Sequence, residues 1–177
     1  MVERRFAGVV PTLRRSHFNE LRRANRPTTV TVMRALGLDL GTKTIGLAVS
    51  DELGITAQGL KTLERRGPRK DLEALKARVA EYAVDRFVIG FPYNMDGSEG
   101  PRAEATRAFG AKLEEETKLP VIYWDERLTT VAAHRVLLEA DVSRKKRKEV
   151  VDQIAAVLIL QGWMDAQRSA AGDAGDE

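Results

Sequence analysis

The amino-acid sequence predicts an α/β fold in which a mixed β-sheet is flanked by helices. Three strand-like segments come first, at residues 35–40, 44–50 and 55–63, and their apolar patterns indicate a hairpin extended by a third antiparallel strand. Helix-like and strand-like segments then alternate, which is typical of parallel strands joined by helical crossovers. The 177 residues, 43% hydrophobic and 31% charged, suit a globular protein with one core.

The first two strands form a predicted hairpin around a tight Gly41-Thr42-Lys43 turn. Both segments alternate or run apolar, as strands with a buried face do. After the third strand, Pro68 and Asp71 favour the start of a helix that continues to about residue 85. Its apolar residues recur on one face at helical spacing: Leu72, Leu75, Val79 and Tyr82.

The second half of the chain continues the alternation. We expect a strand over 86–91, a helix from Pro101 to about Lys118, a strand over 121–124, a helix over about 129–139, and a final helix from 149 to about 168. Pro92 ends the first of these strands, and residues 93–100 have the Asn, Asp, Ser and Gly content of a loop. A basic run, residues 143–148, precedes the final helix.

The formal net charge of +3 is unevenly distributed. Residues 1–32 hold seven arginines against two glutamates, whereas the rest of the chain holds 22 basic and 24 acidic side chains. We therefore predict a basic, disordered extension over 1–32, one folded domain over 33–168 and a flexible tail over 169–177. Other interpretations of the extension are a true start at Met33, a nucleic-acid-binding arm and an Arg-rich organelle presequence.

The composition excludes several kinds of site. No cysteine is present, which excludes disulfides, thiolate catalysis and Cys-ligated zinc and fits a cytoplasmic protein. Only His17 and His134 are histidines, so any metal would be held by oxygen ligands, which favours Mg²⁺ or Mn²⁺. No apolar run approaches the roughly 20 residues of a membrane-spanning helix, so we expect no membrane partner.

Three acidic positions are candidates for such a metal site. Asp39 lies in an otherwise apolar strand, where burying an ionised carboxylate costs several kcal/mol unless a cation or hydrogen bonds compensate. Glu126, with Asp125 beside it, follows the strand over 121–124. Asp152 lies in the first turn of the predicted last helix, on its apolar face.

Each acid also has a structural interpretation. Asp39 would be a buried partner of Arg34 or Lys43, the acids after the last strand would pair with Arg127 or serve the next helix, and Asp152 would favour the start of its helix electrostatically. The functional interpretation rests on convergence at one end of the sheet. Three acids would repel one another there unless one or two divalent cations bound.

Four blocks occur in order: LGLDLGTKTIGLAVSD, VIGFPYNMDGSEGPRAEATRAF, DERLTTVAA and DQIAAVLIL. Together they resemble the YqgF/RuvX family of Holliday junction resolvases over roughly residues 34–165. The resemblance implies an RNase H-like fold, shared with the resolvase RuvC, and a nuclease that depends on Mg²⁺ or Mn²⁺. It also implies a link to trimming the 5′ end of pre-16S rRNA. By position it gives Asp39, Glu126 and Asp152 as the catalytic and metal-binding set, with Asp125 as the alternative to Glu126.

The mechanism that the resemblance implies is two-metal phosphodiester hydrolysis, with Asp39 bridging the ions. Candidate contacts to the nucleic acid are Lys43, Asn94, Arg127, Arg144, Lys145 and Lys146. Lys43 is equally consistent with a solvated turn residue, and Arg127 with a brace for Glu126. The loop with Asn94 is alternatively an ordinary turn, and the basic run a solvated loop.

Two other functions fit part of the pattern. The segment LDLGTKTIG resembles the first phosphate loop of sugar kinases and actin-like ATPases. Such ATPases need a second glycine-rich phosphate loop and a second domain, and we expect neither in these 177 residues. A catalytically silent nucleic-acid-binding protein of the same fold is the other alternative. The sequence does not distinguish branched DNA from precursor rRNA as the partner, and a junction resolvase would act as a two-fold homodimer.

Overall fold

A computed structural model describes residues 34–128 and 144–173 of the chain. At Leu128 and within residues 144–151 and 171–173 it describes the backbone only. Several expectations lie outside the described residues and stay predictions: the extension over 1–32, the start at Met33 and the helix over about 129–139. No helix in the described ranges is long and apolar enough to cross a membrane.

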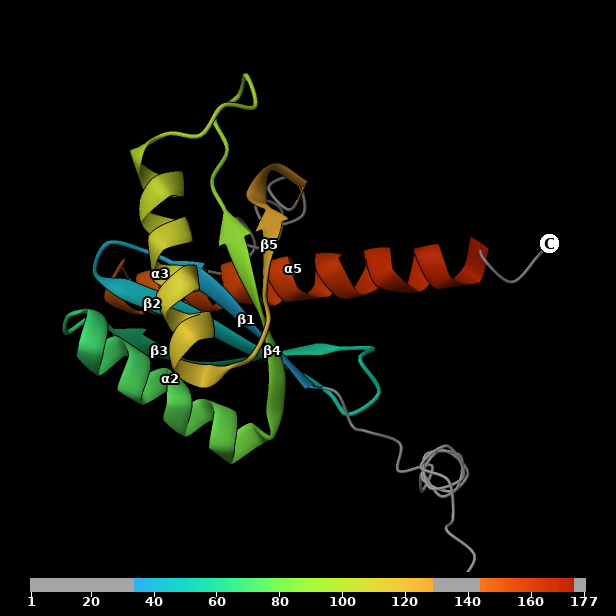
Figure 1. The fold of residues 1–177 in the computed structure, drawn as a ribbon, viewed down its shortest axis with the longest axis horizontal. Helices are drawn as coiled ribbons and strands as arrows, with labels where there is room; N and C mark the ends of the chain where they lie inside the picture. Colours follow the sequence, from blue (N-terminus) through green and yellow to red (C-terminus); the bar gives the residue numbers. More distant parts are fainter. Residues whose placement is uncertain (1–33, 129–143, 174–177) are drawn as a thin grey trace, which may run out of the picture. The chain divides into compact units, whose positions relative to one another are not determined.

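Five strands form one mixed sheet in the order β3-β2-β1-β4-β5 (Figure 1). Their bounds are Arg34–Leu40 for β1, Thr44–Ser50 for β2, Ala57–Glu64 for β3, Val84–Phe91 for β4 and Val121–Asp125 for β5. The first three strands pair antiparallel, whereas β1, β4 and β5 pair parallel. The predicted mixed sheet is therefore confirmed, and the carboxyl ends of β1, β4 and β5 meet at one edge.

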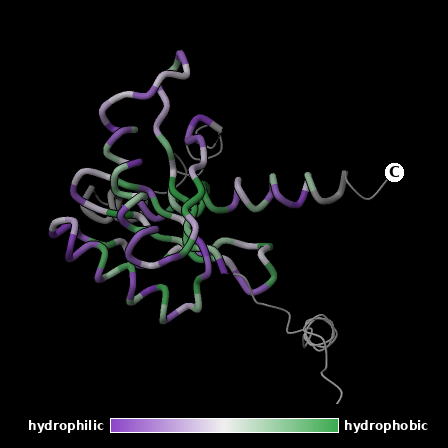
Figure 2. Tube along the Cα trace, viewed as in Figure 1, coloured by the Kyte–Doolittle hydropathy of each residue, from purple (hydrophilic) through white to green (hydrophobic). Residues whose placement is uncertain are grey.

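Helices cover both faces of this sheet. The bounds are Pro68–Tyr82 for α2, Pro101–Thr117 for α3 and Arg144–Asp173 for α5. In Figure 1, α2 and α3 lie on one side of the strands and α5 lies on the other. The tube in Figure 2 is most hydrophobic along the strands between these helices, which is where the two cores lie.

The residues of β1 show how the two cores divide. Leu36 and Leu38 belong to the core beneath α2 and α3, whereas Ala35 belongs to the core beneath α5, together with Ala156 and Leu160. Successive strand residues point to opposite faces. The odd-numbered residues of β1, Asp39 among them, therefore face α5.

Two strands begin elsewhere than predicted. β3 begins at Ala57, because Asp51 holds the preceding residues in a turn by accepting hydrogen bonds from the Ile55 N–H (2.7 Å) and the Thr56 hydroxyl (3.0 Å). β4 begins at Val84 rather than at residue 86, directly after Ala83 ends α2 in the left-handed conformation with φ 53°.

The last helix differs most from the prediction. α5 begins at Arg144, so the basic run is helical instead of a preceding loop, which suits the high helix propensity of Lys and Arg. The expectation that Asp152 lies in the first turn is therefore wrong, because more than two turns come before it. The helix also continues to Asp173 instead of ending near Arg168, through a segment rich in alanine.

Candidate active site

The sheet edge at the carboxyl ends of β1 and β5 carries two of the predicted acids. Asp39 lies near the end of β1, and Glu126 begins the short 3-10 helix η1 (Glu126–Leu128) directly after β5. The third acid, Asp152, comes from α5, the helix that covers the face to which Asp39 points. Three elements far apart in the sequence thus meet at one edge.

Gly46 on β2 allows α5 to approach the sheet at Asp152. It pairs with Asp39 across the β1–β2 ladder. A Cβ atom at Gly46 would lie 2.1 Å from the Asp152 carbonyl oxygen and 3.3 Å from the Asp39 Cβ, so the sheet and helix backbones meet there without an intervening side chain. The Thr44 hydroxyl donates a 2.6 Å hydrogen bond to Asp152 Oδ2 and orients that carboxylate toward β2.

Gly90 on β4 provides the corresponding space for Glu126. A Cβ atom at Gly90 would lie 2.8 Å from Glu126 Oε1 and 2.5 Å from Ile159 Cδ1 of α5. The Glu126 carboxylate therefore lies against the β4 backbone on the α5 face. β4 is the neighbour of β1 in the sheet. The Glu126 side chain, which reaches from η1 over Gly90 of β4, therefore lies on the same face as Asp39 and one strand away from it.

The electrostatics show that Asp39 interacts with both other acids. Burial, followed by the negative charges of Glu126 and Asp152, raises the pKa of Asp39 from 3.8 to about 6. Burial also raises the pKa of Glu126. The positive charge of Arg102, in the first turn of α3, lowers the pKa of both carboxyls but does not cancel the rise.

The acids are close enough to perturb one another but are not gathered into one coordination sphere. Across residues 34–128 and 144–173, no three Asp, Glu or His side chains are arranged to hold a metal ion together. Carboxylates that repel one another are expected to stand apart until a cation lies between them.

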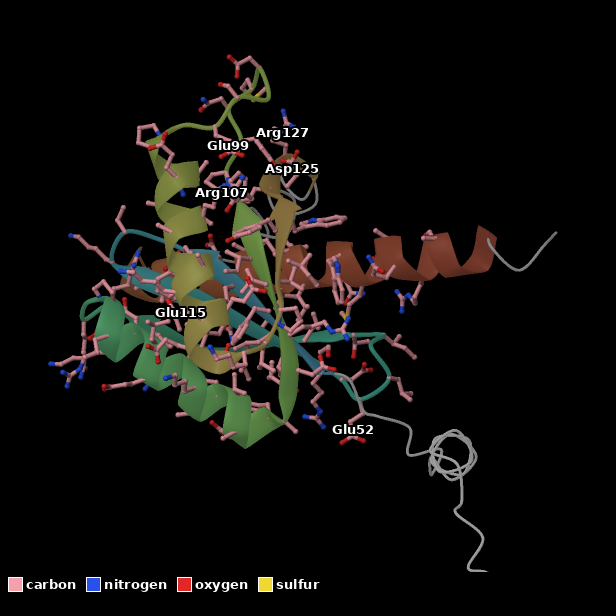
Figure 3. All side chains as sticks on the ribbon, in the orientation of Figure 1. Glu52, Glu99, Arg107, Glu115, Asp125 and Arg127 are labelled. Carbon is pink, nitrogen blue, oxygen red and sulfur yellow. The ribbon has the colours of Figure 1, made fainter. Side chains whose placement is uncertain are left out.

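Asp125, the alternative to Glu126, is occupied by a partner of its own. Arg127 binds it through Nε, at 3.0 Å to both carboxylate oxygens, and through a second guanidinium nitrogen at 2.6 Å. Figure 3 labels the two residues next to each other. This pairing lowers the pKa of Asp125. Arg127 therefore braces Asp125, which is one of the two acids that the sequence offered as its partner.

Arg127 also ties η1 to the loop after β4. One of its guanidinium nitrogens donates to the Asn94 carbonyl oxygen at 3.3 Å, and its guanidinium carbon lies 5.4 Å from the Tyr93 ring centre. The Asn94 side chain donates a 2.9 Å hydrogen bond to the Ser98 hydroxyl, which closes the loop on itself. Two predicted substrate residues, Asn94 and Arg127, thus already have structural partners.

Lys43, another predicted substrate residue, lies exposed in the turn that follows Asp39. Arg65 holds this turn from the β3–α2 loop: its backbone N–H donates to the Lys43 carbonyl oxygen at 2.9 Å, and its guanidinium donates to the Gly41 carbonyl oxygen at 3.0 Å. Asp71, which is buried, accepts a 3.2 Å hydrogen bond from Arg65 Nε. The ion pair therefore positions the Lys43 turn.

We expect Arg65→Ala to lower the free energy of unfolding by about 2–3 kcal/mol, because it leaves the buried Asp71 carboxylate without its cation. Urea denaturation measures the loss. Arg69→Ala is the control, since Arg69 pairs with Glu73 on the exposed surface of the same region and should cost less than about 0.5 kcal/mol. Equal losses in the two variants would show that Arg65 does not brace the turn.

The remaining predicted substrate residues, Arg144, Lys145 and Lys146, lie in the first turn of α5, where the structure describes the backbone only. These residues lie on the same helix as Asp152, roughly two helical turns before it.

A family model described as "RuvX: Holliday junction resolvase" matches residues 33–166 of the chain. The chain belongs to the RuvX family. The resemblance seen in the four sequence blocks is confirmed, and the match includes the segment that also resembles a kinase phosphate loop.

Curated relatives of this RuvX family member include proteins named "Putative pre-16S rRNA nuclease" from Geobacillus kaustophilus, Myxococcus xanthus and Moorella thermoacetica. In that order, the three proteins are 59%, 60% and 61% identical to this chain. The matches cover 77%, 77% and 75% of this chain and 100%, 90% and 95% of the relatives. The family and these names agree on a nuclease, the class of hydrolase that the sequence predicted.

Among solved structures, the yeast mitochondrial Holliday junction resolvase Ydc2 matches with a TM-score of 0.51 at 12% sequence identity. The match covers 80% of this chain and 81% of that one. At this identity it shows the fold alone, and it confirms the predicted RNase H-like architecture.

Sequence reasoning about this RuvX family member missed Arg102 and the two glycines. Arg102 follows Pro101 inside the second block, and its charge reaches both Asp39 and Glu126. Gly46 and Gly90 lie in the first and second blocks, where their role depends on what packs above the strand. A glycine in the interior of a strand is the available signal, because it often marks close approach of another backbone.

Proposed function

We propose that this RuvX family member is a metal-dependent endonuclease that processes the 5′ end of pre-16S rRNA. The observation that carries the proposal is Asp39, a half-buried carboxylate whose pKa is raised by burial and by two further acids on the same face of the sheet. The names of relatives about 60% identical support the rRNA substrate. The description of the family supports Holliday junction resolution as the second candidate.

In this proposal Asp39, Glu126 and Asp152 hold Mg²⁺ or Mn²⁺. Oxygen donors suit these ions, and the repulsion that raises the pKa of Asp39 would be relieved by a cation. When bound, the metal supplies an activated water and stabilises the charge of the leaving oxygen. Glu126 is favoured over Asp125 because the charge of Glu126 acts on Asp39, whereas the Asp125 oxygens bind Arg127.

The chain's own residues would orient the substrate around these acids. Thr44 fixes the Asp152 carboxylate, and Gly46 and Gly90 keep the α5 face open to Glu126 and Asp39. The exposed Lys43 ammonium would meet a phosphate near Asp39 as a point charge.

Further substrate contacts belong to the same proposal. Arg102 would lie beside the reacting phosphate, because it already acts on both Asp39 and Glu126. Arg144, Lys145 and Lys146 would add salt-sensitive phosphate contacts at the start of α5. Arg127 and Asn94 would shape the loop above the site.

The deciding experiment compares three substrates at equal concentration: a pre-16S rRNA fragment, a mobile four-way DNA junction and a linear DNA duplex. Each is incubated with Mg²⁺, Mn²⁺ or EDTA, and products are resolved on a denaturing gel. We expect metal-dependent cleavage near the mature 5′ end of the rRNA fragment. Selective cutting of the junction would favour recombination instead. Binding without cleavage under all conditions would identify the catalytically silent alternative.

The metal site should also respond to pH near the raised pKa of Asp39. A proton competes with the cation below pH 6, so Mn²⁺ affinity should fall by about tenfold per pH unit there and level off above pH 7. Isothermal titration calorimetry with Mn²⁺ from pH 5 to pH 8 measures this dependence. An affinity that is constant down to pH 5 would mean that Asp39 titrates at its ordinary pKa.

Two further expectations remain proposals. A homodimer would be required for symmetric cutting of a four-way junction, so the mass in solution should be measured together with the junction assay. A cytoplasmic location, expected from the cysteine-free composition, fits a role in rRNA processing.

A further inference from the structure

A cavity of about 610 Å³ lies at the outer edge of the sheet between β3 and α2, on the α2 side of the sheet, whereas the acids face α5. Its lining comes from the carboxyl-terminal half of β3, the loop that follows, and the first turns of α2. Because β3 is the last strand in the sheet order, the groove opens along an edge that no strand of the described chain covers.

The lining of this groove is rich in cations. Lys61, Arg66, Lys70 and Arg78 line it, against the two acids Glu64 and Asp71. Both acids are already compensated. Asp71 is the buried partner of Arg65, and Glu64 lies 3.7 Å from Arg66.

The positive charge that remains comes from two lysines. Arg78 forms an ion pair with Glu81, whereas Lys61 and Lys70 have no ion-pair or hydrogen-bond partner within the described parts of the chain. Both lysines are exposed, one from the edge strand and one from the first turn of α2. The groove thus presents two free ammonium groups from opposite walls.

Thr44 connects this groove to the acid site. It lines the groove, and its hydroxyl donates to Asp152 Oδ2 at 2.6 Å. Thr44 also pairs with Glu64 across the β2–β3 ladder, so the acid site and the groove share the same end of two neighbouring strands. A chain leaving the acids over Thr44 therefore reaches the lysines by crossing the edge of β3.

We propose that the groove binds the sugar-phosphate backbone of the substrate on one side of the scissile bond, with Lys61 and Lys70 contacting successive phosphates. The inference rests on the proposed nuclease function and adds a second point of attachment to it. Phosphate contacts position a nucleic acid without reading its sequence, so the groove would set the direction in which the strand leaves the acid site.

The test measures binding in EDTA, so that it does not depend on cleavage. Fluorescence anisotropy follows two labelled single-stranded RNAs, one short enough to cover the acid site only and one with a longer flank. We expect Lys61→Ala combined with Lys70→Ala to weaken binding of the long RNA about tenfold at low salt. The slope of log K against log salt should become less steep by about 1.4, the value for two lost contacts to a single strand.

The control combines Lys112→Ala with Lys118→Ala, which removes the same charge from exposed positions near the carboxyl-terminal end of α3. It should change the affinity for either RNA less than twofold. Loss of affinity for the short RNA in the groove variant, or equal losses in groove and control variants, would overturn the proposal. So would unchanged binding of the long RNA with increased self-association, because the lysines would then serve to protect the edge strand from pairing with another chain.

A parallel cleavage assay of the wild-type protein with Mg²⁺ or Mn²⁺ separates the two proposals. If the lysine substitutions weaken binding of the long RNA but the wild-type protein cleaves nothing, the groove proposal stands and the nuclease proposal fails. If the wild-type protein cleaves with a metal but the lysine substitutions leave binding unchanged, the nuclease proposal stands and the groove proposal fails.

Discussion

Replacing Asp39 with Asn is expected to abolish cleavage and yet to make the metal-free protein more stable. Loss of a metal ligand removes several kcal/mol of transition-state stabilisation, so the rate should fall by about 1,000-fold or more. The stability gain follows from the pKa of about 6, because the folded state then tolerates the ionised carboxylate poorly.

The size of the stability effect depends on pH. Below about pH 4, Asp39 is protonated in both the folded and the unfolded state, and the variant should match the wild type. Between pH 4 and pH 6 the unfolded chain releases the proton and the folded chain retains it, so wild-type stability falls as the pH rises. Above pH 6 the difference should reach a plateau of up to about 3 kcal/mol in favour of Asp39→Asn.

Thermal unfolding in EDTA from pH 4 to pH 8 measures this difference, and added Mn²⁺ should stabilise the wild type only. Glu52→Gln is the control, because Glu52 is exposed on the loop after β2 and pairs with Arg34. The stability of the variant relative to the wild type should be greater at pH 8 than at pH 4. An inactive variant without this increase would contradict the half-buried state of Asp39, in which Arg102 offsets the negative charge only in part.

Gly46→Ala should have the largest structural effect in the site. The new Cβ would lie 2.1 Å from the Asp152 carbonyl oxygen, and since that atom belongs to a helix backbone, α5 must move as a unit. Overpacking of this kind typically costs 1–3 kcal/mol, and here it also displaces Asp152 from Asp39, so we expect lower stability together with loss of Mn²⁺ binding and of cleavage. Urea denaturation and calorimetry measure the two losses.

Gly59→Ala provides the matched control. Gly59 lies on β3 beneath the same helix, and its new Cβ would meet the Gln153 side chain, 2.6 Å from Cγ. A flexible side chain can turn aside where a backbone cannot, so the control should lose less stability and keep its metal affinity. If both variants behaved alike, the contact between the β2 and α5 backbones would not be what places Asp152.

The sequence predicted the sheet well, because strand pairing of this kind depends on local patterns. Local patterns also drew attention to the three acids that the structure brings to one edge of the sheet. Alternating apolar residues in the segments 35–40 and 44–50 specify a hairpin, and an Asp inside such a strand signals an unusual requirement at that position. The order of four blocks then gave the family. The starts of β3 and β4 were missed because Asp51 and Ala83 set them through turn geometry, which apolar periodicity does not report.

What remained hidden depends on contacts between distant segments. The pairing of Arg127 with Asp125 is decided by which side chain faces outward after β5, and a run of three charged residues does not reveal that. The Arg65 brace joins a loop to a turn more than twenty residues earlier. The start of α5 was misplaced because a block of like charges suggested a loop, although Lys and Arg favour helices individually.

The contrast between Asp39 and Gly46 bears on how such a protein would change over evolutionary time. Losing the acid is expected to leave the architecture intact and to make the metal-free protein more stable, whereas a side chain above the glycine is expected to disturb helix and sheet together. A lineage relieved of selection for cleavage would therefore discard the aspartate early and retain the glycine. Descendants of that kind would persist as folded, non-enzymatic proteins that still present the same surface to their ligand.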